Sequence, residues 1–346
     1  MHMRLPGARV VSVAAAVGLL AAGAAYGAAA RHTGNVTKVA IATPAKASDY
    51  GWNQQGVNGA RAAAASVGAK FQAVTNIGYD KTDVVLRQLA QGGASFIVAH
   101  ASGYDTIATR IAKKYKVPTI TYDVPTNLSK GYVSYVTTSS QQGAYLAGIL
   151  AAKTTKTHKV GIIISASDSN WYKMSGGFAV GFRSLDKTSK IFFATVSPTG
   201  YDDAAGGKRV ANSVIAQGAD VIFAMGDNAS FGYLQAIETA KVGHKVWFIG
   251  DIGDMTPIDK NHVFLSSVLW NFTDTFKQAI KDVNAGTYGT HGYDLSLKNG
   301  GISLLRSKYI PASVWAQITA ARAKIMSGSI KIPAASKAGE VQKLIK

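Results

Sequence analysis

The sequence predicts an α/β protein with two similar lobes, each built on a parallel β-sheet covered by helices. Three observations lead to this prediction. Short apolar runs alternate with helical segments, the runs are apolar throughout rather than at every second residue, and the pattern restarts half-way along the chain. Runs that are apolar throughout are typical of strands buried on both faces, as in parallel sheets whose crossover helices cover them.

The composition agrees with this prediction and excludes several other classes. The chain has 346 residues, 47% hydrophobic and 16% charged, so it can bury a substantial core and is not of the disordered type. The absence of cysteine excludes a disulfide scaffold, a thiolate metal site and a cysteine nucleophile. The formal net charge is +18, but the basic residues are scattered. We therefore expect no nucleic-acid partner and a basic, solvated surface.

Residues 1–30 are expected to form a secretory signal peptide. Arg4 and Arg9 precede an apolar run that extends to about Tyr26, and small residues follow it. A charged start, a short apolar stretch and a small-residue cleavage site are the parts of such a signal. The alternative is a retained N-terminal anchor. No later segment has 18 consecutive apolar residues, so we expect an exported protein, periplasmic or extracytoplasmic and soluble, without a lipid-anchored cysteine.

The first half of the chain predicts strands and helices in alternation. Its first strand is the apolar run KVAIAT, and an alanine-rich helical segment follows. The strands are expected at residues 38–43, 70–75, 95–99, 119–122 and 133–136. The helices are expected at residues 55–67, 82–91, 105–115 and 142–152.

The second half repeats this alternation from the run KVGIIIS onward. The strands are expected at residues 159–165, 191–196, 221–225, 246–250 and 263–268. The helices are expected at residues 175–185, 204–217, 231–241 and 273–284, with C-terminal helices at 314–326 and 332–346.

The restart is an internal repeat. A Lys-Val strand start, a Ser-Asp pair, a tryptophan and two glycines recur in the same order. They occupy positions 38–39, 48–49, 52, 56 and 59 in the first half, and 159–160, 167–168, 171, 177 and 181 in the second. The repeat predicts two Rossmann-like lobes of about 100–130 residues each.

The loops after the strands are the candidate site, because ligands of open parallel sheets bind beyond the carboxyl ends of the strands. Each of these loops supplies an Asp or Asn, and most supply an aromatic residue or a glycine. The candidate ligand-binding residues are Asp49, Tyr50, Trp52, Asn53, His100, Tyr104, Trp171, Asp227, Asp254 and Trp270. For each Asp and Asn the alternative is a helix cap, and for His100 a structural loop histidine.

Three tryptophans at strand ends indicate the chemistry of the ligand. Trp52, Trp171 and Trp270 stand where packing alone would accept smaller residues. Flat ring walls with a few Asp and Asn groups suit a flat, neutral, hydrogen-bonding ligand such as a nucleobase or a sugar. They suit phosphate badly, because these loops carry almost no Arg or Lys.

The sequence has no recognisable catalytic or cofactor motif. The seven histidines show no HxH or HExxH spacing, and there is no GxSxG elbow, P-loop or GxGxxG. We therefore expect a binding protein rather than an enzyme, with no metal and no cofactor.

Several motifs resemble the basic membrane protein (BMP) family. They are DYGWN at 49–53 with the glycines at 56 and 59, QGAYLAGILAA at 142–152, and KVG at 159–161 with GFAVGF at 177–182. The resemblance covers about residues 38–305. The family comprises substrate-binding components of ABC importers, often for purine nucleosides, with the periplasmic binding protein type I fold. The resemblance implies a small-molecule ligand, a permease partner in the membrane, and two lobes joined by a three-segment hinge that close on the ligand.

The resemblance also implies lobe boundaries and residue roles. The N-terminal lobe would comprise residues 38–138 plus 252–300, and the C-terminal lobe 139–251 plus 301–346. The crossovers would fall near 136–140, 250–254 and 299–303. The aromatic residues near 49–53 and Tyr104 would stack on the base, and Asp49 and Asn53 would hydrogen-bond near it. Asp227 and the loop 250–254 would face the ligand from the other side.

Two departures from the family pattern concern the ribose. Nucleoside-binding members usually carry a lysine in the strand that here reads SSVLWN, where this chain has Trp270, and a VDSDQ-like loop where it reads DIGDM. Losing a cation and gaining an indole favours a flatter, less hydroxylated ligand. A purine base and a purine nucleoside both stay open. The other hypotheses are a sugar receptor or a ligand sensor of the same fold, and a nucleoside hydrolase that uses an Asp cluster.

Overall fold

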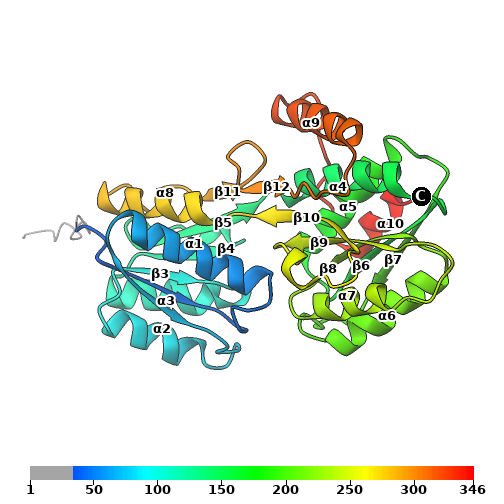
Figure 1. Cartoon of the computed structure of the whole chain (residues 1–346). Coiled ribbons are helices and arrows are strands. Elements are labelled where there is room, and N and C mark those ends of the chain that lie inside the picture. Colours follow the sequence, from blue (N-terminus) through cyan, green and yellow to red (C-terminus); the bar gives the residue numbers. More distant parts are fainter. Residues whose placement is uncertain (1–33) are drawn as a thin grey trace, which may run out of the picture. The chain divides into compact units, whose positions relative to one another are not determined.

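The computed structural model describes residues 34–346, which form two six-stranded sheets with helices on both faces (Figure 1). The signal peptide predicted for residues 1–30 lies outside the described residues. The first sheet has the strand order β11-β5-β4-β3-β1-β2, and the second has the order β12-β10-β9-β8-β6-β7. Apart from the edge strands β11 and β12, both orders follow the doubly wound pattern 2-1-3-4-5. The internal repeat of the sequence is therefore a repeat of topology.

The first sheet is parallel and carries four helices. Its strands are β1 (Lys38–Ala42), β2 (Lys70–Val74), β3 (Phe96–Ala99), β4 (Thr119–Tyr122), β5 (Val133–Thr138) and β11 (Tyr293–Leu295). Its helices are α1 (Trp52–Ser66), α2 (Thr82–Gln91), α3 (Asp105–Tyr115) and α8 (Thr273–Asn284). Helix α1 packs beside α8, and α2 packs beside α3 (Figure 1).

The second sheet is parallel except for its last strand, since β12 pairs with β10 in the antiparallel direction. Its strands are β6 (Lys159–Ile164), β7 (Lys190–Thr195), β8 (Val221–Met225), β9 (Trp247–Ile252), β10 (Phe264–Trp270) and β12 (Ile302–Leu304). The helices are α4 (Ser140–Thr154), α5 (Ser169–Arg183), α6 (Ala204–Ala216), α7 (Ala229–Glu238), α9 (Ala312–Met326) and α10 (Ala338–Leu344). Helices α4 and α5 form one pair, and α6 and α7 form another.

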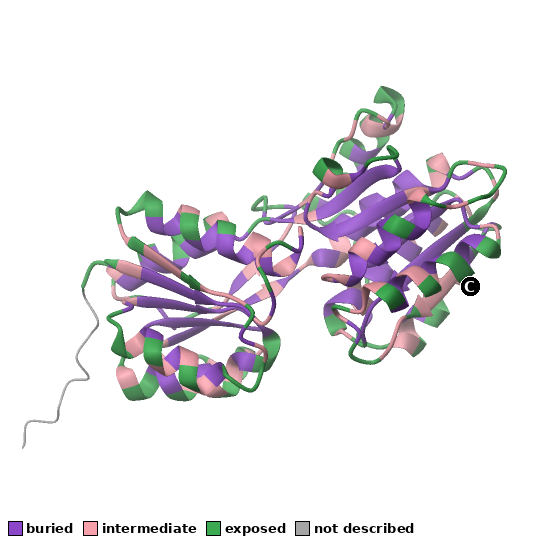
Figure 2. Cartoon of the chain, turned by 60° about the horizontal axis from the view of Figure 1, so that its bottom comes forward, coloured by how far each residue is buried: buried purple, intermediate pink, exposed green. Residues whose placement is uncertain are grey.

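The central strands of both sheets are buried, as the apolar runs predict, whereas the edge strands β2 and β7 are mostly half-buried. The four residues of β3 and the five of β8 are all buried, and Figure 2 shows the strands enclosed between half-exposed helices. The glycines of the α4 and α5 motifs let these two helices approach closely. A Cβ at Gly148 would lie 2.1 Å from the carbonyl oxygen of Phe178, and one at Gly181 would lie 2.0 Å from that of Tyr145. The helix motif that resembles the BMP family therefore reflects packing of this pair.

Three segments connect the two sheets, but one differs from the predicted position. The chain passes from β5 to α4, from β10 to α8 and from β11 to β12. The first and third passages agree with the crossovers expected near 136–140 and 299–303. The second lies after Trp270, not near 250–254, because β10 pairs with β9 in the second sheet. The assignment of all of residues 252–300 to the first lobe is therefore wrong for β10.

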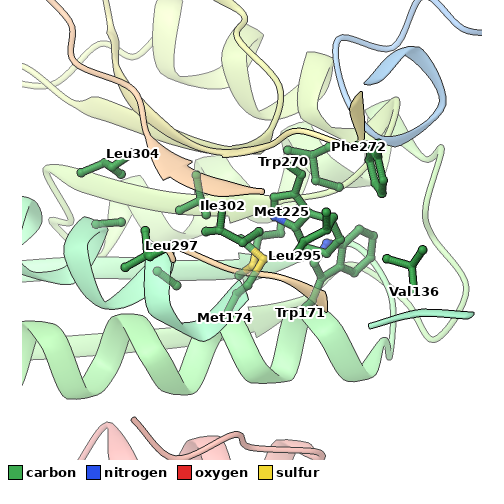
Figure 3. Packing of buried hydrophobic residues seen from close by; sticks show 14 of the residues in the cluster. Val136, Trp171, Met174, Met225, Trp270, Phe272, Leu295, Leu297, Ile302 and Leu304 are labelled. Carbon is green, nitrogen blue, oxygen red and sulfur yellow. The ribbon is translucent and has the colours of Figure 1, made fainter. Parts of the chain in front are cut away.

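One apolar core continues from one sheet to the other. The largest cluster of buried apolar side chains includes Val136 and Leu295 of the first sheet together with Trp270 and Ile302 of the second. Figure 3 shows these side chains around Trp171. The polypeptide passages between the sheets therefore run through packed side chains.

Candidate functional site

A cavity of about 580 Å³ lies at the carboxyl ends of strands from both sheets. Its size falls within the range of roughly 300–1,000 Å³ typical of small-molecule sites. The first lobe contributes Pro44, Trp52, Tyr79, Ala101, Ser102 and Gly103. The second lobe contributes Asp168, Asn170, Trp171, Thr199, Tyr201, Asp227, Ile252 and Trp270.

Four of the ten candidate residues line this cavity: Trp52, Trp171, Asp227 and Trp270. They come from the start of α1, the start of α5, the loop after β8 and the end of β10. The sequence-based argument from strand ends thus brings all three tryptophans to one place.

Trp52 is held as a flat wall by His100. The two rings are stacked, with centroids 4.2 Å apart and planes 17° apart. The indole Nε1 of Trp52 donates to the carbonyl oxygen of His100 at 3.0 Å, and Nε2 of His100 lies 2.9 Å from the carbonyl oxygen of Trp52. Because His100 covers one face of the indole, the cavity meets the opposite face or the edge.

His100 is a support for the wall and not a contact of the cavity, contrary to the prediction. It is fully buried, and burial lowers its pKa to about 3, so the imidazole is neutral. Its Nε2 faces a carbonyl oxygen and must carry the proton, so its Nδ1 accepts from the hydroxyl of Tyr122 at 2.5 Å. Gly56 makes room for the ring, since a Cβ there would lie 2.1 Å from Nε2 of His100.

Asp49 and Asn53 hold the start of α1 and do not line the cavity, which corrects their predicted role. Both are buried. Asp49 accepts from the backbone N–H groups of Gly51, Asn53 and Gln54 and from the Asn53 amide. The Asn53 side-chain oxygen accepts from the N–H of Ala45 at 3.3 Å. The helix-cap alternative therefore describes both residues.

The remaining candidates also lie outside the cavity. Tyr104 is buried, donates to the carbonyl oxygen of Gly78 and packs edge-on against Tyr79, which does line the cavity. The ring of Tyr50 meets Phe231 of the other lobe, with centroids 6.4 Å apart. The carboxylate of Asp254 accepts from the N–H of Thr256 at 2.8 Å and lies in a separate hollow.

The wall formed by the second lobe contains two differently bonded indoles. Nε1 of Trp171 donates to the carboxylate of Asp251 at 3.0 Å, and its ring lies 5.2 Å from that of Tyr201. Trp270 is only 3% exposed, yet its Nε1 has no hydrogen-bond partner among the described residues. An unpaired buried donor is costly, and because Nε1 is itself closed to solvent, the indole of Trp270 lines the cavity through its other ring atoms.

The second lobe also supplies three carboxyl groups. Asp168 caps α5 by accepting from the N–H groups of Asn170 and Trp171. Burial raises the pKa of Asp168, and burial raises that of Asp251, behind the wall, to about 8. The side chain of Asp227 has no hydrogen-bond donor among the described residues. Burial, together with the neighbouring carboxylates, raises its pKa well above the usual value.

Asn170 connects the two lobes beside the cavity. Its amide nitrogen donates to Asp123 at 3.1 Å, and its amide oxygen accepts from the hydroxyl of Thr138 at 2.9 Å. Both partners belong to the first lobe or its connection to α4. The two lobes are therefore held together here by directional bonds.

Ten lining residues were not candidates, and four of them carry groups suited to ligand binding: Tyr79, Asp168, Asn170 and Tyr201. Asp168 precedes α5 and Asn170 lies in its first turn, after β6. This segment corresponds in the repeat to the loop around Asp49 after β1, so the repeat itself was a usable signal. Tyr79 follows β2 and Tyr201 follows β7, at the same edge of each sheet, but at strands whose loops were not examined for ligand groups.

The model of the Bmp family, described as "ABC transporter substrate-binding protein PnrA-like", matches residues 36–336. The chain belongs to this family. Among curated relatives, it is 27% identical over 214 residues to the "ABC transporter nucleoside-binding protein BmpA" of Lactococcus lactis, covering 58% of this chain and 60% of the relative. It is 26% identical over 206 residues to "Basic membrane protein A" of Borreliella afzelii, covering 57% and 60%. The matches thus span about 60% of the relatives' length.

Solved structures share the fold at lower identity. An ABC transporter solute-binding protein from Conexibacter woesei has a TM-score of 0.72 at 21% identity, covering 86% of this chain and 99% of that one. One from Aeropyrum pernix has a TM-score of 0.74 at 19% identity, covering 89% and 96%. The arabinose-binding protein AraP of Geobacillus stearothermophilus has a TM-score of 0.60 at 18% identity, covering 78% and 96%. The periplasmic binding protein type I fold is thereby confirmed.

In the described part of the chain, residues 34–346, none of the helices is long and apolar enough to cross a membrane. No group of three or more His, Asp or Glu side chains in it could hold a metal ion.

Proposed function

We propose that this chain is the exported solute-binding component of an ABC importer and that its solute is a purine base or a purine nucleoside. The cavity between the lobes encloses this solute, and closure of the lobes presents it to the permease. The observation that carries the proposal is the set of three indoles, Trp52, Trp171 and Trp270, around one cavity of about 580 Å³.

The tryptophan walls favour a flat aromatic solute. The ring of Trp52 is fixed from behind by His100, and the ring of Trp171 by its bond to Asp251. Rings held in this way lose little side-chain entropy when a base stacks on them. Stacking of a base on an aromatic side chain contributes about 1–3 kcal/mol.

The polar groups of the cavity can recognise the edges of a purine. The carboxyl groups of Asp168 and Asp227 line the cavity and can bond the amino or hydroxyl groups of a purine base or nucleoside. Among the described residues, no lysine replaces the cation that nucleoside-binding relatives are expected to use. The base and the nucleoside therefore both remain candidates.

A sugar is the second candidate solute. Proteins with the same fold include, by their titles, an arabinose-binding protein and a glucose-galactose binding protein. Aromatic walls with carboxylates also suit a sugar ring. The three indoles favour the purine, because a flat aromatic base stacks on an indole face more completely than a puckered sugar ring does.

A thermal-shift panel tests the proposal. The protein without its signal segment is melted with adenine, guanine, xanthine, adenosine, guanosine, ribose, arabinose and glucose. A solute present at about 100 times its dissociation constant adds about 2.7 kcal/mol to the free energy of unfolding. We expect stabilisation by at least one purine. Stabilisation by sugars alone would leave the fold in place and refute the purine assignment.

A further inference from the structure

The cavity is lined by carboxyl groups and, within residues 34–346, by no basic side chain. Asp168 and Asp227 line it, and none of its lining residues within the described chain is Lys, Arg or His. A carboxyl group that faces a cavity without a cationic partner is costly to ionise. A neutral sugar or base would leave this cost uncompensated.

Asp227 is the lining residue whose charge is opposed by the largest set of neighbouring carboxyl groups. Its side chain has no donor among the described residues, and the groups that act on its charge come from five other elements. They are Asp49 before α1, Asp168 before α5, Asp202 before α6, Asp251 in β9 and Tyr79 after β2. All of the carboxyl groups in this set disfavour a negative charge on Asp227, so a positive partner is the missing component.

The walls are also suited to a cation. The electron-rich faces of indole and phenol rings attract positive charge, and most strongly where water is excluded. Trp52, Trp171, Trp270 and Tyr201 all line the cavity.

We propose that the solute is a flat nitrogen heterocycle that carries a positive charge, with its charged edge at Asp227 and Asp168. This inference rests on the proposed function, since it names the charge class of the solute for the same cavity. Binding ionises Asp227, and the proton of its carboxyl group passes to solvent. The raised pKa of the empty-site carboxyl supports this proton release.

Two matched pairs of small molecules test the proposal. 1-Methyladenosine is a cation at neutral pH, and its isomer N6-methyladenosine is neutral, so the two differ mainly in charge. 1-Methylnicotinamide and nicotinamide form a second pair that lacks the purine. Titration calorimetry in two buffers of different ionisation enthalpy measures affinity and proton release together. We expect the cation of at least one pair to bind about tenfold or more tightly than its neutral partner, with proton release.

Two variants test whether Asp227 causes the preference for the cation and the proton release. Asp227→Asn keeps the shape of the side chain and is expected to abolish both the preference for the cation and the proton release. Because the Asp227 side chain makes no hydrogen bond among the described residues, the variant should melt no lower than the wild type. Asp80→Asn is the matched control, since Asp80 is an exposed carboxylate that lies outside the cavity and does not act on the charge of Asp227. It should keep the preference.

The outcomes separate this inference from the proposed function. If neutral purines bind and the cations do not, the charge proposal is overturned and the purine assignment stands. If only the nicotinamide pair shows the preference, the charge proposal stands and the purine assignment fails. Failure of both cations to bind overturns the charge proposal, as does a preference that persists in Asp227→Asn.

Discussion

The contact between Gly253 and Tyr50 offers a direct test of lobe closure. Gly253 follows β9 of the second lobe, and Tyr50 precedes α1 of the first. A Cβ at Gly253 would lie 1.6 Å from the carbonyl oxygen of Tyr50, whereas Cβ atoms essentially never approach another atom within 3.0 Å. The substitution Gly253→Ala therefore requires the two lobes to separate here by about 1.4 Å.

The size of the effect follows from this overlap. Inserting a methyl group into a packed contact costs about 1–3 kcal/mol. Since about 1.4 kcal/mol corresponds to a factor of ten, the solute should bind about 5–150 times more weakly. The two residues belong to different lobes, so opening relieves the overlap when no solute is bound. The melting temperature of the ligand-free variant should therefore match that of the wild type.

Titration calorimetry with the solute that stabilises the wild type measures this loss. Gly243→Ala is the matched control, because a Cβ at Gly243 would meet no atom within 4 Å. Wild-type affinity in Gly253→Ala would refute the reasoning that this contact belongs to the solute-bound form. A lowered melting temperature without solute would show instead that the contact stabilises the fold.

Three further predictions concern the supports of the cavity. Gly56→Ala places a Cβ 2.1 Å from Nε2 of His100 and should lower the free energy of unfolding by about 1–3 kcal/mol. Solute binding should also weaken, because Trp52 loses the support of the His100 ring. An unchanged denaturant midpoint would contradict this prediction. Folding stability should fall as pH rises from about 6.5 to 8, because Asp251 with a pKa of about 8 keeps a proton that the unfolded chain has lost and contributes up to about 1.4 kcal/mol per pH unit; the raised pKa of Asp227 adds to the decline in the same direction. Below about pH 6.5, His100, with its pKa of about 3, has the opposite slope, because the unfolded chain binds a proton that the folded chain does not; denaturant unfolding of Asp251→Asn should show a shallower alkaline decline than the wild type. Trp270→Phe keeps a ring but shortens a buried wall of the cavity, so it should lower the melting temperature and weaken solute binding about 2–10-fold, and a gain in affinity would contradict the role of this wall.

Most of the fold was predictable, because a strand that is covered on both faces of its sheet appears in the sequence as a continuous apolar run. The strands β1 to β10 coincide with apolar runs in the sequence, and α8 was predicted at the residues it occupies. The three-residue strands β11 and β12 were missed, since three residues are too few for a pattern. The sheet to which β10 belongs depends on pairing between distant segments, which apolar runs do not encode.

The sequence predicted a lining residue correctly where its position at the end of a strand brings it to the cavity. It failed where local hydrogen bonds or packing hold the side chain elsewhere. Strand-end tryptophans reach the cavity because parallel strands end at one edge. Asp49 and His100 stand at similar positions, but helix capping and packing against Gly56 use their polar atoms. Tyr79 and Tyr201 enter through loops that only the folded chain brings close.

The most direct test of the central claim uses tryptophan fluorescence. Three of the five tryptophans of the chain line the cavity, so a solute that stacks there must change their emission. The account predicts a saturable change on titration with at least one purine base, nucleoside or methylated cationic analogue, and little change with ribose, arabinose or glucose. A saturable response to sugars alone, or to none of the heterocycles, would contradict it.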